Sequence, residues 1–267
     1  MENNHTFIII IAAAVVIYVI YKLCSFWFAK HGGNEGWITE TKPSMAWQRL
    51  TNCWWKFFFT VYNRVEIKNT HYIPADPKQN FVTVANHASI LDGFIMGMSV
   101  WRPIYIMVKK EAFEMPIESW YLRKVYTFPV DRSKVDTGAI KLAMKHLSDG
   151  DCLGLFPEGT RNRQGFVSEF KPGAIKLALK KKVPIIPAYI GNSHSITPLH
   201  TILPRPAKLT VTFLEPIDTK AELEAGKTEQ DILDMLYKKI TEAGAEIMGH
   251  DVRDPEYLKN LESKPQK

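Results

Sequence analysis

The stretch FVTVANHASILD, residues 81–92, decides how the rest of the chain can fold. Residues 81–85 are apolar or β-branched and predict a buried strand. The polar residues that follow, beginning with Asn86 and His87, end this strand, and a helix is expected to begin near Asp92. A strand that turns into a helix is the repeating unit of α/β sheets, whose active-site residues gather at strand ends. The stretch therefore predicts an α/β fold with a site at His87.

His87 and Asp92 are five residues apart. On an unbroken helix their side chains would diverge by about 140°, so they can meet only if His87 lies in the turn and Asp92 in the first helical turn. In that arrangement Asp92 would fix the imidazole tautomer and leave the other ring nitrogen as a general base. The alternative is that His87 merely ends a strand and Asp92 caps a helix.

Ser89 and three further histidines are weaker candidates for a nucleophile or a base. Ser89 could act as a nucleophile, but no G-x-S-x-G elbow surrounds it, and a turn or capping role is favoured. His146, His194 and His200 are interpreted as surface or structural residues, because no acidic partner at a suggestive spacing was identified for them.

A second polar cluster, FPEGTRNR at residues 156–163, follows a predicted strand at 152–156. Pro157 would stop that strand, and Gly159 would let the backbone approach a ligand. Arg161 can bind a phosphate through two parallel hydrogen bonds. The alternative is a surface turn with incidental charge. The sequence contains neither a Walker lysine pattern nor GxGxxG, which argues against nucleotide binding of those two kinds.

The rest of the body continues the α/β pattern, in which short β-rich runs alternate with helical periodicity. The predicted strands are 81–85, 104–108, 152–156, 184–190 and 209–214. The predicted helices are a helix capped by Asp136 and running to 148, a second at 171–179, and an amphipathic C-terminal helix at 230–248.

The N-terminal residues 7–21, FIIIIAAAVVIYVIY, carry no charge. If Lys22 snorkels, the apolar run extends to Phe28 and gives about 22 residues, or roughly 33 Å of helix, enough to span a bilayer. A cleaved signal peptide is the alternative, but a basic start and a small-residue cleavage site are missing. Lys22 and Lys30 flank the distal end, which predicts that the bulk of the chain faces the cytoplasm.

A second apolar stretch, residues 47–62, is rich in Trp and Phe and is interrupted by Arg49 and Lys56. Aromatic residues mixed with basic ones are typical of a helix in the headgroup region of a membrane. A helix packed on the core of the domain explains the pattern equally well, and the sequence leaves both open.

The composition fits one catalytic domain, with 267 residues of which 46% are hydrophobic and 23% charged. The net charge of +6 favours anionic partners such as lipid surfaces, phosphorylated metabolites or nucleic acid. Nucleic acid is disfavoured, because the aromatics concentrate in the apolar N-terminal third and the basic run 180–182 is typical of a solvated face. Cys24, Cys53 and Cys152 are expected to be free thiols, and no metal site is predicted.

Together, N-H-x-S-x-x-D at 86–92 and FPEGTR at 156–161 resemble the motifs of the 1-acylglycerol-3-phosphate acyltransferase family. The segments KKE at 109–111, FPVDR at 128–132 and VPIIP at 183–187 look like further blocks of this family. The resemblance covers about residues 80–214. The sequence departs from it at Ser119 and Tyr126, where glycines are common, so the acyl-chain preference and the exact acceptor stay undetermined.

The resemblance implies that His87 is the general base and Asp92 its orienting partner. It assigns binding of the acceptor phosphate to Glu158, Gly159, Thr160, Arg161, Arg132 and Lys109. It also implies direct transfer of a fatty acyl group from acyl-CoA or acyl carrier protein to the free hydroxyl of 1-acyl-sn-glycerol-3-phosphate, which gives phosphatidic acid. No cofactor, metal or acyl-enzyme is expected.

We therefore expect a single α/β domain of the glycerolipid-acyltransferase type with an N-terminal transmembrane helix and a second interfacial or membrane-associated helix. The expected parts are an anchor at 1–30, a linker and interfacial helix at 31–79, a catalytic core at 80–217, and an amphipathic helix with a polar tail at 218–267. Membrane lipids, a lysophospholipid and the acyl donor are the expected partners. The alternatives are a related acyltransferase that acts on glycerol-3-phosphate or another lysophospholipid, a lipid hydrolase using Ser89 and His87, and a non-enzymatic binding protein.

Overall fold

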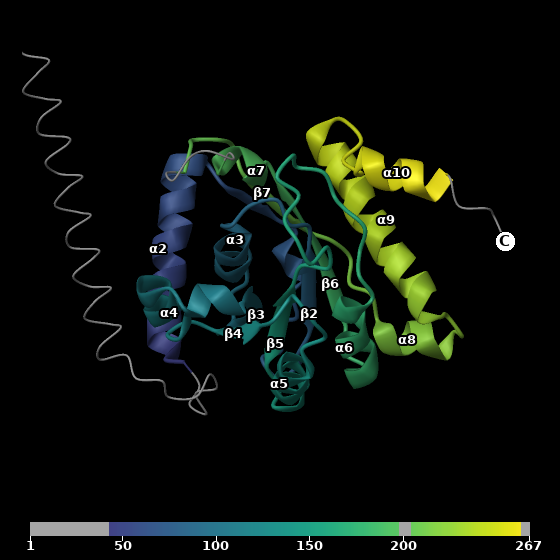
Figure 1. Ribbon diagram of the computed structural model, residues 1–267, viewed down its shortest axis with the longest axis horizontal. Helices are drawn as coiled ribbons and strands as arrows, with labels where there is room; N and C mark the ends of the chain where they lie inside the picture. Colours follow the sequence, from purple (N-terminus) through teal and green to yellow (C-terminus); the bar gives the residue numbers. More distant parts are fainter. Residues whose placement is uncertain (1–42, 198–203, 263–267) are drawn as a thin grey trace, which may run out of the picture.

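A computed structural model of the protein describes residues 43–197 and 204–262 (Figure 1). Seven strands form one sheet in the order β1-β7-β6-β2-β5-β3-β4. The strands are β1 (Glu66–Lys68), β2 (Val82–Ala85), β3 (Ile104–Lys109), β4 (Thr127–Val130), β5 (Cys152–Leu155), β6 (Ile185–Gly191) and β7 (Thr210–Phe213). The α-helices are α2 (Met45–Asn63), α3 (Asp92–Ser99), α4 (Pro116–Leu122), α5 (Thr137–Ser148), α6 (Gly173–Lys181), α7 (Ser193–Ile196), α8 (Thr219–Glu224), α9 (Glu229–Met248) and α10 (Pro255–Glu262), with short 3-10 helices at Thr70–Tyr72 and Lys110–Phe113.

The five strands from β2 to β6 run parallel, and β7 pairs antiparallel with β6. Strands β2, β5 and β6 are buried along their whole length, as expected for central strands covered on both faces. Because parallel strands end at the same edge of a sheet, the segments after β2, β3, β4, β5 and β6 all emerge at that edge. This alignment brings the two polar clusters of the sequence together, since β2 and β5 are neighbours.

Helices cover both faces of the sheet, as Figure 1 shows. On one face α5, α6 and α9 bury residues such as Ala143, Ile175 and Leu236 against the sheet. On the other face α2 and α3 contribute Phe59, Ile95 and Met96 to a second apolar cluster. The predicted α/β class is therefore confirmed as a mixed sheet between two helical layers.

The predicted strands and helices of the body are confirmed, and their ends differ from the observed ones by at most two residues. Strands β1 and β4 were missed. Strand β4 contains Pro129, which lacks an amide hydrogen and argues against a strand, but β4 is the edge strand, where proline is tolerated. Strand β1 lies in the segment predicted as a linker, yet it pairs with β7 and belongs to the same sheet.

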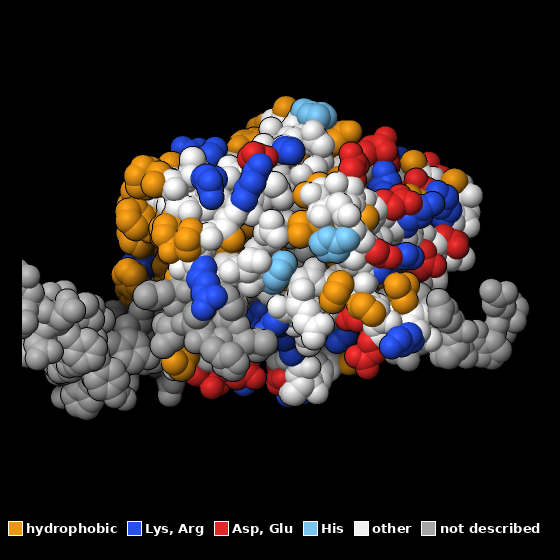
Figure 2. Space-filling model, turned by 90° about the horizontal axis from the view of Figure 1, so that it is seen from above, with side chains coloured by type: hydrophobic (Ala, Val, Ile, Leu, Met, Phe, Trp, Pro, Cys, Tyr) orange, Lys and Arg blue, Asp and Glu red, His pale blue; other side chains and the backbone are white. Residues whose placement is uncertain are grey.

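Helix α2 combines the two roles that its sequence left open. On its inner side Trp55 packs on Phe94 of α3 with ring centroids 4.7 Å apart, and Phe59 is fully buried. On its outer side Trp54 and Phe57 are 62% and 63% exposed. Figure 2 shows hydrophobic side chains gathered at the edge of the molecule that α2 occupies in Figure 1. The helix is thus packed on the domain and also presents an apolar face outward.

The predicted N-terminal anchor, residues 7–28, lies outside the described residues. Within the described ranges, no helix has both the length and the apolar character needed to cross a membrane. Cys53 and Cys152 are free thiols, the first exposed and the second buried.

Gly244 of α9 tests how tightly the C-terminal helix packs on β6. A Cβ atom added there would lie 2.5 Å from the Tyr189 ring and 2.7 Å from a Val252 methyl group. Overpacking of this kind costs about 1–3 kcal/mol, against a gain of about 1 kcal/mol in helix propensity. We expect Gly244→Ala to lower the free energy of unfolding by about 1 kcal/mol, measured by urea denaturation.

The matched control is Gly173→Ala at the start of α6, where an added Cβ would contact nothing within 4 Å. This variant should be as stable as the wild type or slightly more stable. Equal stability of Gly244→Ala and Gly173→Ala would contradict the tight contact between α9 and Tyr189.

Candidate active site

The turn after β2 places His87 against the carboxylate of Asp92, the first residue of α3. The His87 Nδ1 and Asp92 Oδ2 atoms are 2.9 Å apart. The same Oδ2 accepts hydrogen bonds from the backbone amides of Ala88 at 2.7 Å and Ser89 at 2.8 Å. Asp92 is fully buried and His87 is 8% exposed. The predicted arrangement, with His87 in the turn and Asp92 in the first helical turn, is therefore the one in the structure.

These hydrogen bonds select one tautomer of His87. A carboxylate can only accept hydrogen bonds, so the ring nitrogen Nδ1 carries the proton that it donates to Asp92. In the neutral imidazole the other nitrogen, Nε2, then has a free lone pair and can accept a proton. The pair can thus act as a general base whose orientation is fixed by Asp92.

Glu158 fixes the backbone of the same turn. Its Oε1 accepts a hydrogen bond from the His87 amide at 2.7 Å, and its Oε2 accepts one from the Ser168 amide at 3.0 Å. The side chain is buried, and this burial raises the pKa of Glu158 to about 8. The structure therefore places Glu158 behind His87, with both of its oxygens bonded to backbone amides.

Two further residues shape the turn in ways that the sequence analysis did not assign. Asn86 is buried, and its amide group bonds the backbone of Ile190 in β6 twice, at 2.7 and 3.0 Å. The ring of Phe156 stacks on the ring of His87 with centroids 4.3 Å apart. Each is the first residue of a quoted motif, and their position at the ends of the paired strands β2 and β5 was the available signal.

Ser89 has the turn role that was favoured for it. Its hydroxyl accepts a hydrogen bond from the Leu91 amide at 3.1 Å and lies 2.7 Å from the hydroxyl of Thr197. The hydroxyl is thus engaged on the side of Leu91 and Thr197, and these contacts do not support its use as a nucleophile activated by His87.

The cationic residues predicted to bind a phosphate surround the loop after β5. Arg132, which follows β4, donates from Nη1 to the Gly159 carbonyl at 3.1 Å. Burial, followed by repulsion from Arg161, lowers the pKa of Arg132. Gly159 has a φ of 71°, a conformation that glycine adopts readily. Two guanidinium groups held close enough to repel each other form a site that favours an anion.

The two remaining predicted contacts lie at the rim of this loop. Thr160 is exposed. Lys109 ends β3, where it pairs with Val130 of β4, and its side chain is exposed. The register therefore brings Lys109 to the same edge of the sheet as Arg132, one strand away from it.

The interpretation of His146 as a residue without an acidic partner was wrong. Its Nδ1 lies 3.1 Å from Asp151 Oδ2, with the same five-residue spacing as the pair at His87. This second pair lies between the end of α5 and the start of β5, at the opposite edge of the sheet, and its imidazole stacks on Tyr105. The spacing alone thus does not distinguish the two pairs, which differ in lying at opposite edges of the sheet.

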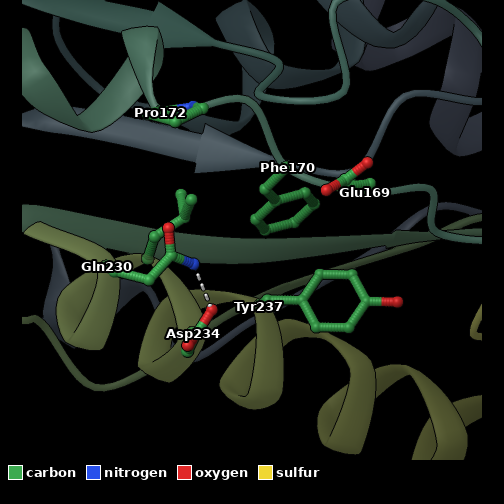
Figure 3. A pocket seen from close by; sticks show the side chains of 7 residues that line it. Glu169, Phe170, Pro172, Gln230, Asp234 and Tyr237 are labelled. Atoms are coloured by element: carbon green, nitrogen blue, oxygen red, sulfur yellow. Dashed lines mark hydrogen bonds between the residues drawn. The ribbon is translucent and has the colours of Figure 1, made fainter. Parts of the chain in front are cut away.

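Away from His87 and the loop after β5, two observations on the described residues concern a possible second site. A pocket of about 80 Å³ lies between Phe170 and α9, where Gln230, Asp234 and Tyr237 line it (Figure 3). In the parts of the chain that the structure describes, no group of three or more His, Cys, Asp or Glu side chains could hold a metal ion.

Comparison with known proteins finds relatives that are acyltransferases. A protein-family model described as Acyltransferase matches residues 64–191. The chain is 33% identical to the 1-acyl-sn-glycerol-3-phosphate acyltransferase of Bacillus subtilis over 140 residues, which cover 52% of this chain and 68% of that protein. It is 25% identical to the enzyme of the same name from Haemophilus influenzae over 90% of this chain and 95% of the relative.

A solved structure of an acyltransferase is similar to this chain as well. The crystal structure of the 1-acyl-sn-glycerophosphate (LPA) acyltransferase PlsC from Thermotoga maritima matches with a TM-score of 0.64 and 25% identity, covering 75% of this chain and 79% of the other. The resemblance noted in the sequence is thereby confirmed. The chain belongs to the 1-acyl-sn-glycerol-3-phosphate acyltransferase family and is a glycerolipid acyltransferase.

Proposed function

We propose that the protein transfers a fatty acyl group from acyl-CoA or acyl carrier protein to the free hydroxyl of 1-acyl-sn-glycerol-3-phosphate, which yields phosphatidic acid. The observation that carries this proposal is the buried pair of His87 and Asp92, which leaves Nε2 of the imidazole as a base. The names of the relatives support the acceptor.

In the proposed reaction, Nε2 of His87 removes the proton of the acceptor hydroxyl as its oxygen attacks the thioester carbonyl carbon. A C–O bond forms and gives a tetrahedral intermediate. The intermediate collapses, the C–S bond breaks, and the departing thiolate takes the proton from the imidazolium. Asp92 stabilises the imidazolium, because its carboxylate is already aligned with Nδ1. No acyl-enzyme forms, so no second nucleophile is needed.

Arg161 and Arg132 bind the phosphate of the acceptor in this proposal, with Gly159, Thr160 and Lys109 around them. Glu158 has a different part from the one implied by the family resemblance. Glu158 is buried, and its two oxygens already accept hydrogen bonds from the amides of His87 and Ser168. We therefore interpret Glu158 as a positioning residue that holds the backbone of the base.

We further propose that the protein works at the cytoplasmic surface of a membrane, with the N-terminal segment as its anchor. The support is the outward face of α2, where Leu50, Trp54, Phe57 and Val61 are each more than half exposed. Exposed apolar faces rich in Trp and Phe are typical of helices that lie at a bilayer surface. Both the single-chain acceptor and the two-chain product partition into that surface.

The activity is tested by supplying lysophosphatidic acid with an acyl thioester and identifying the product by mass spectrometry. Phosphatidic acid is the expected product. Glycerol-3-phosphate and other lysophospholipids, supplied in parallel, test the related acceptors. Release of free fatty acid without acylated product would contradict the proposal.

The base is tested by removing either member of the pair. We expect His87→Ala and Asp92→Asn each to lower kcat by at least about 100-fold, the contribution expected of a general base and of the group that orients it. The control is His146→Ala, which removes the histidine of the other pair with the same spacing. Its kcat should stay close to wild type, and an equal loss in all three variants would contradict the assignment.

Glu158 predicts a pH dependence of stability. Its ordinary pKa of 4.5 is raised in the folded chain to about 8, chiefly by burial. The stabilisation from the protonated form is full below pH 4.5 and is lost as the pH rises through about 8. Relative to Glu158→Gln, the wild type should lose on the order of 1 kcal/mol of unfolding free energy per pH unit within that window. Urea denaturation at several pH values measures this, and a difference that is constant with pH would rule it out.

The exposed apolar face of α2 predicts a loss of turnover that depends on whether the acceptor lies in vesicles or is dissolved in water. Trp54→Ser/Phe57→Ser should lower turnover of lysophosphatidic acid in vesicles by about tenfold, because apolar area that would be buried in lipid is lost. Turnover of a short-chain acceptor dissolved as monomers should be unchanged. The control is Trp101→Ser. Trp101 is 57% exposed and lies outside α2, between α3 and the start of β3. Equal losses with both forms of the acceptor would contradict membrane contact by α2.

A further inference from the structure

A groove lies between the loop at 161–168 and helix α10, next to the proposed active site. It has a volume of about 790 Å³, and Arg161, Arg163 and Lys259 contribute its positive charges. Its other lining residues are polar or acidic except for Pro255, so it offers no surface for an acyl chain. The groove is large enough for an organic ligand and opens to solvent.

The C-terminal segment builds one wall of this groove. The Val167 amide donates to the Val252 carbonyl at 2.7 Å, and the Asp254 amide donates to the Val167 carbonyl at 3.1 Å. The Asp254 carboxylate accepts from Asn162 Nδ2 at 2.9 Å and from the Ser168 hydroxyl at 3.2 Å. The loop and the segment before α10 are thus joined by both backbone and side-chain hydrogen bonds.

The same loop is joined to the base. The Asn162 amide donates to the carbonyl of His87 at 2.8 Å. Arg161 and Arg163 flank Asn162, so the cationic end of the groove begins one residue from this contact. The loop that lines the groove is therefore hydrogen-bonded directly to the residue proposed as the base.

The charge of the groove favours an anion. Two carboxylates, Asp254 and Glu256, line the groove with the three cations, so the formal charge of the lining is +1, three minus two. The Asp254 carboxylate accepts hydrogen bonds from Asn162 and Ser168. Arg163 is close enough to Arg161 to repel it, and this repulsion, after burial, lowers the pKa of Arg161. Adjacent guanidinium groups of this kind bind phosphates through charge-assisted hydrogen bonds.

We propose that this groove binds the phosphorylated pantetheine carrier of the acyl donor. The proposal rests on the function proposed above, in which two anionic ligands must meet at His87. The acceptor is short between its phosphate and its hydroxyl, so its phosphate belongs near Arg132 and Gly159, which do not line the groove. The donor is long and its phosphates lie far from the thioester carbon, so an open polar groove beside the loop that bonds His87 fits it. Arg161 lines the groove and also repels Arg132, so it would serve both ligands.

Coenzyme A and the prosthetic group of acyl carrier protein share this chemistry. Steady-state kinetics of the full chain are measured with whichever of acyl-CoA and acyl carrier protein the wild type turns over. We expect Arg163→Gln/Lys259→Gln to raise the KM for the donor by about 3- to 10-fold, the effect of losing two exposed charge contacts. The KM for lysophosphatidic acid should be unchanged. Arg132→Gln should show the reverse, with a raised acceptor KM and an unchanged donor KM.

The matched control is Lys141→Gln/Lys238→Gln, which removes two positive charges from exposed positions on α5 and α9. Neither KM should change in this variant. With acyl-CoA, a donor that lacks the 3′-phosphate should have a higher KM than acyl-CoA in the wild type, and this difference should shrink in Arg163→Gln/Lys259→Gln. With acyl carrier protein, a higher donor KM in that variant is the supporting result.

The outcomes separate this proposal from the function on which it rests. A wild type that makes no phosphatidic acid with either donor overturns both. A wild type that makes phosphatidic acid, together with an Arg163→Gln/Lys259→Gln variant whose donor KM is unchanged, overturns only the donor groove. A rise in the KM for lysophosphatidic acid in that variant would instead assign the groove to the acceptor.

Discussion

One oxygen atom, Oδ2 of Asp92, organises the proposed active site. It accepts hydrogen bonds from the imidazole of His87 and from the amides of Ala88 and Ser89. The two amides hold the carboxylate in the turn, so the ring that binds the same oxygen is oriented by the backbone. Removing the carboxylate would leave two buried amides without an acceptor, each costing about 1–3 kcal/mol. The orientation of the His87 ring and the local stability of this turn therefore have the same source.

Two other acidic side chains extend this arrangement through the chain. Glu158 joins the amide of His87 to the amide of Ser168, and Asp254 joins the side chains of Ser168 and Asn162. The turn after β2, the loop after β5 and the segment before α10 are far apart in sequence and are linked by these acids in series. The C-terminal segment is thus structurally coupled to the base, although it lies outside the matched family region.

The sequence revealed the elements whose local pattern matches their environment. Buried central strands such as β2 and β6 are continuous apolar runs, and Asp136 caps its helix as predicted. Strand β4 was missed because Pro129 violates local propensity and is tolerated only at the edge. The pairing of His146 with Asp151 shows that a local pattern can also occur away from the proposed site, since its spacing equals that of His87 and Asp92. Only the topology, which brings strand ends to one edge, distinguishes the two, and topology is set by contacts distant in sequence.

The two arginines proposed to bind phosphate are themselves held in an unfavourable state. Burial, followed by repulsion from Arg161, lowers the pKa of Arg132. Burial, followed by repulsion from Arg163, lowers the pKa of Arg161, and attraction by the fully buried Asp92 opposes this shift. Phosphates on the acceptor and the donor carrier would relieve the repulsion between the guanidinium groups, so the two anionic ligands proposed here would stabilise the cations that bind them.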